Sequence, residues 1–235
     1  MDTIGILITN IIPLYCLIGL GYLAGKTLRL DLKTLAGLAI FIFAPIVVFG
    51  AMTKIEFEPA FTVLPFFSFT LGAIITIGLY SLTRAYFLEG AHPNLIGLGS
   101  VGGNTGYFGL PLVLALYGEQ WAGPYILMNI GTQLTEYLIG YYLAVRSQAS
   151  IKDSLVKVIK LPAIHALYIG LIINFTGTEL PETFYDYWTY AVGGWVFVGM
   201  MIIGVALSRI DHFEFDLKLI SWLFISKFIC WPALG

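Results

Sequence analysis

The residues best suited to chemistry lie in one apolar, glycine-rich stretch near the middle of the chain. Asn104 and Thr105 are polar, and Pro111 interrupts helical hydrogen bonding because it has no N–H and its ring clashes with the preceding turn. Gly106 and Gly109 add backbone freedom. We therefore expect two half-helices that meet between Asn104 and Pro111, the second presenting free N–H groups near Gly109. A helix N-terminus attracts negative charge, so the predicted chemistry is anion binding by these five residues.

A continuous helix is the alternative interpretation of the same stretch. Small residues let helices approach closely, so a glycine-rich helix can be a packing element and nothing more. An unpaired peptide group is costly in hydrocarbon, so a broken helix is expected only where protein or a water-filled cavity satisfies it. The polar pair at Asn104 and Thr105 favours a binding site over packing.

A second set of polar side chains follows in residues 124–145. Asn129, Thr132, Gln133 and Glu136 recur at helical spacing and share one face of an otherwise apolar helix. A carboxylate inside a membrane is costly and usually faces protein or water, so we expect Glu136 to be a proton- or cation-coupling group. The alternative is a carboxyl group near the cytoplasmic end of the helix that is held by structural hydrogen bonds.

Lys227 is a second charge within an apolar segment. It could offset an anionic substrate, pair with Glu136, or lie nearer a membrane surface. The chain contains no HExxH motif, no GxxxxGK[ST] phosphate loop and no nucleophile constellation. We therefore expect no catalytic residues, no metal site and no cofactor, with H+ or Na+ as the candidate coupling ion.

The composition indicates an all-α integral membrane protein. Of 235 residues, 58% are hydrophobic and only 11% are charged, against about 25% charged residues in soluble domains. The net charge of −2 gives no support to nucleic-acid binding. Apolar segments of spanning length are predicted at residues 3–24, 34–53, 61–87, 93–118, 124–145, 161–175, 187–208 and from 217 onward.

Charge in the loops predicts the orientation of these segments. Ten of the twelve Lys and Arg residues lie in the alternate loops after the first, third, fifth and seventh segments or in the segment ends beside those loops. Positive loops face the cytoplasm, which places the amino terminus outside. Residues 146–160 would form the longest cytoplasmic loop, either as a helix lying on the membrane surface or as a plain basic linker.

The first and sixth segments share an early proline and a Gly-Leu pair, in PLYCLIGLGYLAG and PAIHALYIGLIINFTG. An offset of five helices would invert the second copy, so residues 1–145 and 161–235 are interpreted as two inverted repeats, the second incomplete. Inverted repeats with broken helices at mid-membrane are typical of secondary transporters. Chance similarity between two apolar helices is the alternative.

The run GNTGYFGLPL at residues 103–112 resembles the fourth-helix motif of the auxin efflux carrier family, which includes plant PIN-type exporters and bacterial organic-acid permeases. Tyr117-Gly118, the GLGYL run at 19–23 and Ala44-Pro45 are similar too. The resemblance implies ten helices in two inverted repeats, a moving transport domain, and a scaffold of helices one, two, six and seven that forms a homodimer. Substrate would bind at a crossover marked by Asn104 and Pro111. This chain would be truncated in the eighth helix.

The function predicted from these features is secondary active transport of a small organic anion, a carboxylate such as a dicarboxylate or an auxin-like acid. Alternating access would expose the helix break to each side of a plasma or bacterial inner membrane in turn. Two other functions stay open: a sodium-coupled bile-acid-type carrier, and a membrane sensor or scaffold that keeps the fold without transporting anything. The expected partners are the lipid bilayer, the anion and a second copy of the chain.

Overall fold

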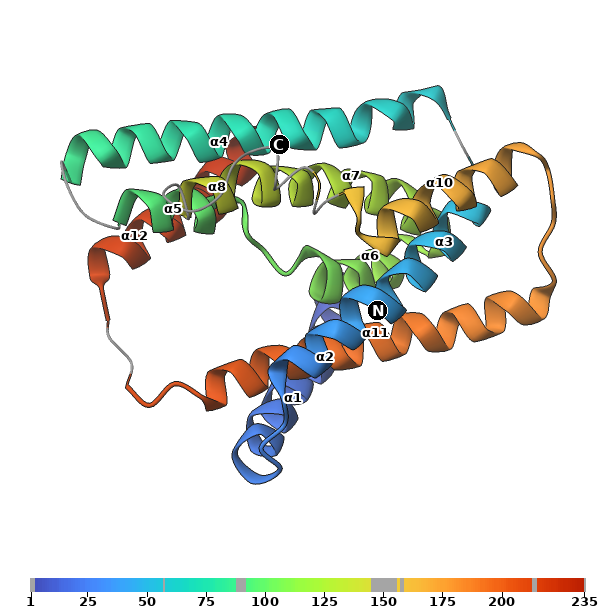
Figure 1. Ribbon diagram of the computed structural model, residues 1–235, viewed down its shortest axis with the longest axis horizontal. Coiled ribbons are helices and arrows are strands. Elements are labelled where there is room, and N and C mark those ends of the chain that lie inside the picture. Colours follow the sequence, from blue (N-terminus) through green and yellow to red (C-terminus); the bar gives the residue numbers. More distant parts are fainter. Residues whose placement is uncertain are drawn as a thin grey trace. The chain divides into compact units, whose positions relative to one another are not determined.

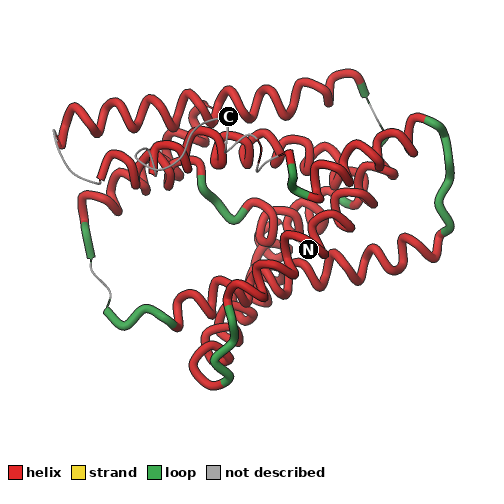
Figure 2. The backbone as a smooth tube through the Cα atoms, in the orientation of Figure 1, coloured by secondary structure: helices red, strands yellow, loops and turns green. Residues whose placement is uncertain are grey.

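The computed structural model describes residues 3–56, 58–87, 92–144, 156, 159–212 and 215–234. These residues form helices and connecting loops, with no strand among them (Figures 1 and 2). Five of the described helical segments are long and apolar enough to cross a membrane. The prediction of an all-α membrane protein is confirmed. Most of the predicted linker 146–160 lies outside the described residues, and its surface helix stays a prediction.

Each predicted apolar segment contains helix. The helices are α1 (Thr3–Thr27), α2 (Leu32–Leu38), α3 (Ala44–Lys54), α4 (Val63–Phe87), α5 (His92–Val101), α6 (Leu110–Tyr117), α7 (Ala122–Thr135), α8 (Tyr141–Ala144), α10 (Pro162–Phe175), α11 (Glu182–Ser208), α12 (Leu217–Ile225) and α13 (Trp231–Leu234). The largest boundary difference from expectation is at α11, which begins at Glu182 and not at Tyr187. Pro181 precedes its first turn with a fixed φ, and the Glu182 carboxylate suits the positive end of the helix dipole.

Four wide π-helical turns interrupt these segments. They are η1 (Ala39–Phe43), η3 (Thr105–Gly109), η5 (Glu136–Gly140) and η6 (Ser226–Cys230). Three of them end two residues before a proline, at Pro45, Pro111 and Pro232. In a regular α-helix a proline ring clashes with the carbonyl four residues earlier, and here that carbonyl lies within the π-turn. The wider turn therefore lets the helix continue past the proline.

Contacts between Cα atoms divide the chain into two compact units. The first contains Met1–Phe57, Asn104–Ile126 and Leu161–Phe213, and the second contains Glu58–Gly103, Leu127–Lys160 and Glu214–Gly235. Units of this kind reflect neighbouring elements, whereas a repeat reflects symmetry in sequence. The division 1–145, 146–160 and 161–235 therefore stays a prediction.

In the first unit, α1 and α11 pack closely because glycines replace side chains where they cross. A Cβ atom on Gly21 would lie 2.8 Å from the Cα of Met201, and one on Gly204 would lie 2.5 Å from the backbone nitrogen of Tyr22. Gly170 of α10 makes a similar approach, since its Cβ would lie 2.9 Å from the Phe49 carbonyl oxygen in α3. These clashes would be with backbone, which cannot rotate away. The helix pairs α1–α11 and α3–α10 therefore depend on glycine.

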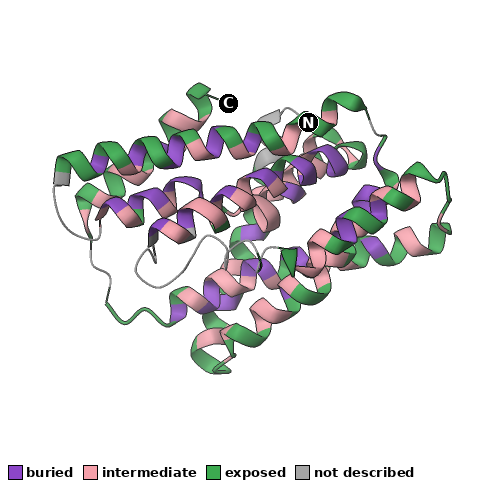
Figure 3. Ribbon diagram, turned by 45° about the horizontal axis from the view of Figure 1, so that its top comes forward, coloured by how far each residue is buried: buried purple, intermediate pink, exposed green. Residues whose placement is uncertain are grey.

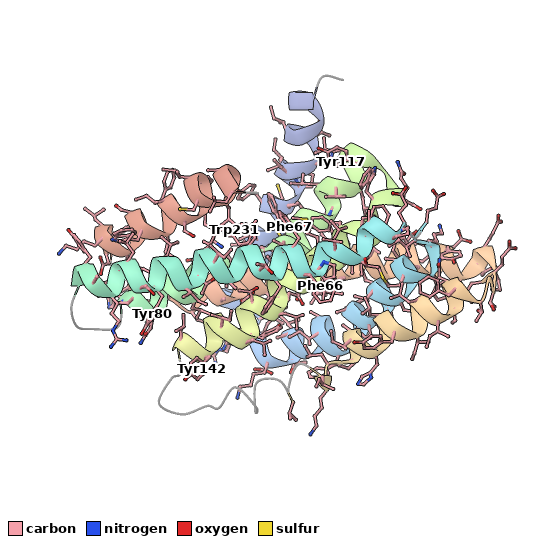
Figure 4. The ribbon with its side chains drawn as sticks, turned by 90° about the horizontal axis from the view of Figure 1, so that it is seen from above. Phe66, Phe67, Tyr80, Tyr117, Tyr142 and Trp231 are labelled. Carbon is pink, nitrogen blue, oxygen red and sulfur yellow. The ribbon has the colours of Figure 1, made fainter. Side chains whose placement is uncertain are left out.

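The second unit is built on α4, along which buried and exposed positions alternate (Figure 3). Ser68 donates to the Met128 carbonyl at 2.7 Å and Thr135 donates to the Phe69 carbonyl at 3.0 Å, which joins α4 to α7. Trp231, labelled in Figure 4, belongs to an apolar group that packs against the buried residues of α4 and α5. That buried set comprises Leu71, Ile75, Leu79 and Ile96, and its partly buried neighbours are Leu219, Trp222, Cys230 and Trp231.

The start of α12 is fixed to the start of α5 within this unit. The Asp216 side chain caps α12 by accepting from the backbone N–H groups of Lys218 and Leu219 at 3.0 and 3.1 Å. Asp216 Oδ2 also lies 2.5 Å from His92 Nε2. The hydrogen bond from His92, with those from the backbone, lowers the pKa of Asp216 below its ordinary value. This contact sets the position of the helix that carries Lys227.

The glycine crossing gives a stability prediction. Replacing Gly21 with leucine should lower the melting temperature in detergent, because overpacking against backbone costs about 1–3 kcal/mol. Gly19→Leu is the matched control, since a Cβ atom on Gly19 meets no atom within 4 Å. Thermal unfolding of both variants checks the prediction, and equal melting temperatures would contradict it.

Candidate functional site

The helix predicted to be broken is broken in the structure. The last residue of α5 is Val101, residues 102–104 are not helical, and helix resumes at Thr105 (Figure 2). The continuous-helix alternative is therefore wrong. The break lies just before the predicted interval between Asn104 and Pro111, because η3 accommodates Pro111 inside the second half-helix.

Asn104 caps the second half-helix. Its side-chain Oδ1 accepts from the backbone N–H of Tyr107 at 3.2 Å. Its carbonyl accepts from the N–H groups of Phe108 and Gly109, both at 3.3 Å. The expectation of a free N–H near Gly109 is therefore wrong, because Asn104 already uses that donor. The positive end of this half-helix lies at Asn104 instead.

The amide nitrogen of Asn104 makes a much weaker interaction. Nδ2 donates to the thioether sulfur of Met200 at 3.3 Å, and a thioether is a weak acceptor. Met200 is fully buried in α11, in the cluster that includes Leu14 and Val196. A stronger oxygen acceptor could therefore replace the sulfur at Nδ2 at little cost.

An aromatic pair joins the same half-helix to α11, entirely within the first unit. The rings of Tyr107 and Trp195 meet edge to face with centroids 4.9 Å apart. Gly199 makes room for Tyr107, since a Cβ atom there would lie 2.6 Å from the ring carbon Cδ2. Trp195 is 8% exposed, and its Nε1 has no hydrogen-bond partner among the described residues. Leaving a buried donor unpaired costs about 1–3 kcal/mol, so this N–H is suited to a bound acceptor.

The other predicted site residues of this stretch have structural contacts. The carbonyl of Thr105 accepts the Tyr125 hydroxyl at 2.7 Å. A Cβ atom on Gly109 would lie 3.0 Å from the Tyr125 ring carbon Cζ, so glycine is needed there. Gly106 lies in η3 and Pro111 follows it in α6. All of these residues belong to the first unit.

The carbonyl groups near the end of α5 accept hydrogen bonds from side chains of η6 and α13. Lys227 Nζ donates to the Gly102 carbonyl. The Ser100 carbonyl accepts from Trp231 Nε1 at 2.8 Å and from Ser226 Oγ at 3.3 Å. The final carbonyls of a helix lack intrahelical donors and carry partial negative charge, so an ammonium group suits this position.

Glu136 lies beside the same helix end. Its Oε1 would be 3.6 Å from a Cβ atom built on Gly102, and its carboxylate interacts electrostatically with the Lys227 ammonium. Both side chains are half-buried, and both belong to the second unit. Glu136 and Lys227 therefore both lie beside Gly102, but the salt bridges among the described residues do not include this pair, and their pairing stays a prediction.

The other polar residues predicted to share a helix face with Glu136 lie on α7. Asn129 is 8% exposed, and the Thr132 hydroxyl donates to the Asn129 carbonyl at 3.0 Å within its own helix. Gln133 is half-buried one turn before Glu136. The π-turn η5 begins at Glu136, and π-turns are frequent at functional sites.

Sequence reasoning missed Trp195, Tyr107 and Trp231 as site residues. An aromatic residue in an apolar helix is normally packing, and nothing in its spacing indicates what its polar atom contacts. A tryptophan N–H usually finds a partner when buried, so the signal for Trp195 appears only once the neighbouring helix is known.

Comparison with known proteins gives two matches. A family model described as "Membrane transport protein" matches residues 6–152. An uncharacterized transporter of Methanocaldococcus jannaschii is 27% identical over 184 residues, which covers 75% of this chain and 60% of that protein. The chain thus spans three-fifths of this relative's length. The family model covers more than half of the chain, so the protein belongs to the membrane transport protein family, the family of the auxin efflux carriers.

Proposed function

We propose that this membrane transporter is a secondary active carrier of a small organic anion, and that the substrate carboxylate binds at Asn104. The observation that carries the proposal is the start of the second half-helix, where the dipole is positive and the Asn104 amide, among the described residues, donates only to a thioether. Half-helix N-termini inside membranes suit anionic groups. The unpaired Trp195 N–H in the same unit is a second donor for a carboxylate or carbonyl oxygen.

Alternating access fits the position of the break in the chain. One of the points at which the chain passes between the two compact units falls between Gly103 and Asn104, at the end of the non-helical segment. Transport by rigid-body motion needs a connection that changes its backbone angles while the helices on both sides stay intact. Residues 102–104 are such a connection.

The proposal also includes the orientation of the chain in the membrane and a homodimer contact. We assign the amino terminus to the outside and the basic loops to the cytoplasm, on the distribution of Lys and Arg. We assign a homodimer contact to the first, second, sixth and seventh predicted helices. All of these belong to the first compact unit.

Replacing Asn104 with aspartate tests the anion site. Aspartate is as good a helix cap as asparagine, so the fold should be kept. The variant loses the Nδ2 donor and adds a negative charge, so uptake of a labelled carboxylate panel into proteoliposomes should fall by about tenfold or more. Asn104→Ser, which keeps a cap without the charge, separates loss of the donor from repulsion.

Three outcomes of that assay would oppose the proposal. Carboxylate uptake by a folded Asn104→Asp variant at the wild-type rate would place the substrate elsewhere. Carboxylate binding without flux in the wild type would favour a sensor. Uptake of steroid acids driven by a sodium gradient would favour a bile-acid-type carrier.

Glu136 gives a prediction for coupling. Replacing it with glutamine removes a titratable group but keeps its size, so the dependence of transport on pH should weaken. The measurement is initial uptake against external pH in proteoliposomes. Thr189→Val, at an exposed position of α11 where the hydroxyl donates only within its own helix among the described residues, is the control and should keep the wild-type profile. An unchanged profile for Glu136→Gln would exclude it as the coupling group.

A further inference from the structure

We propose that the Lys227 ammonium takes the position of a bound cation at the end of α5. Transport would then need no sodium ion. The site belongs to the second unit and consists of the Gly102 carbonyl, which accepts from Lys227, with the Glu136 carboxylate beside Gly102. The statement about transport rests on the proposed function, whereas the statement about cation binding does not.

The groups around Lys227 Nζ are those that bind a hard cation. Carboxylate and carbonyl oxygens are the ligands that such ions prefer, and the last carbonyls of a helix add the negative end of its dipole. The Gly102 carbonyl accepts from Lys227, and Glu136 Oε1 lies beside the same residue, 3.6 Å from the position of a Cβ atom on Gly102. A Cβ atom on Gly102 would make only ordinary van der Waals contact with Glu136 Oε1, so the carboxylate lies beside the helix end without depending on this glycine.

Neighbouring contacts hold the lysine in this position. Ser226 is fully buried and donates to the Ser100 carbonyl at 3.3 Å, and Trp231 donates to the same carbonyl at 2.8 Å. Ser226 immediately precedes Lys227, and Trp231 lies one helical turn after it. Leu223 fixes the same helix against α5, since it fills the space beside Gly99. The ammonium is therefore held in place by η6, which packs against α5, and not by a loop.

Charge balance gives the functional consequence. The Glu136 carboxylate and the Lys227 ammonium together carry no net charge, and a sodium ion added to them would be repelled by the ammonium. A covalently attached cation also cannot dissociate to the other side of the membrane. Transport should therefore be equally fast in sodium and in choline salts.

Removing the ammonium should convert the site into one that takes an added cation. In the full-length Lys227→Ala variant, melting temperature and uptake should both fall, because the carboxylate and the carbonyl lose their partner. Sodium or ethylammonium, compared with choline at constant ionic strength, should then raise the melting temperature by about 2–4 °C. The wild type should show no such shift.

Two variants test whether that response comes from this site. Lys227→Met keeps the length of the side chain without its charge, so it should fill the space and show no response to cations. Lys227→Ala combined with Glu136→Gln should also lose the response. Lys218→Ala, at the start of the same helix, should behave as the wild type.

The melting experiment stands apart from any transport assay. A cation-dependent shift in Lys227→Ala supports the site even if the protein transports no carboxylate. A specific sodium shift in the wild type overturns the proposal without any variant. A folded Lys227→Ala protein that responds to neither cation overturns it too. If Lys227→Ala does not fold, the Lys227→Met variant decides the question. Stabilisation of Lys227→Met by sodium would overturn the proposal.

Discussion

Hydrogen bonding of the backbone at the break between α5 and η3 is the constraint on which the rest of the site depends. Hydrocarbon offers no partner to a free peptide group. The two sides of the break meet this need differently. The second half-helix is capped locally, by Asn104 in its own sequence. The first is capped from a distance, by Lys227 and Trp231 of the last helix. One side therefore depends on a single residue, and the other on correct packing of the second unit.

Much of the fold could be predicted because hydropathy and proline are local signals. Apolar length located the helices, and the start of α11 was misplaced because a polar first turn looks like a loop. The break was predicted but shifted toward Pro111. Proline was given the weight of a helix breaker, whereas a π-turn before it lets the helix continue. The interruption lies instead at Gly102 and Asn104, where neither residue alone requires it.

The candidate site was predictable only where a residue carried its own signal. Asn104 and Glu136 are polar in apolar surroundings, and Lys227 is a charge where charges are rare. The partner of Lys227 could not be foreseen, because the Gly102 carbonyl is a backbone acceptor that every residue possesses. Trp195 and Trp231 resemble ordinary packing residues until the helices beside them are placed. Contacts between residues a hundred positions apart depend on tertiary structure that residue spacing does not encode.

The π-turns before Pro45, Pro111 and Pro232 also bear on how distant relatives should be aligned. A π-turn holds one residue more than the α-helical turn that it replaces. A one-residue gap in an alignment is therefore structurally acceptable at these turns, since the flanking helical faces keep their directions. The same gap elsewhere in the last helix would rotate Lys227 by about 100° relative to the residues before the gap. Gap placement thus decides whether a lysine in a relative is the counterpart of this one.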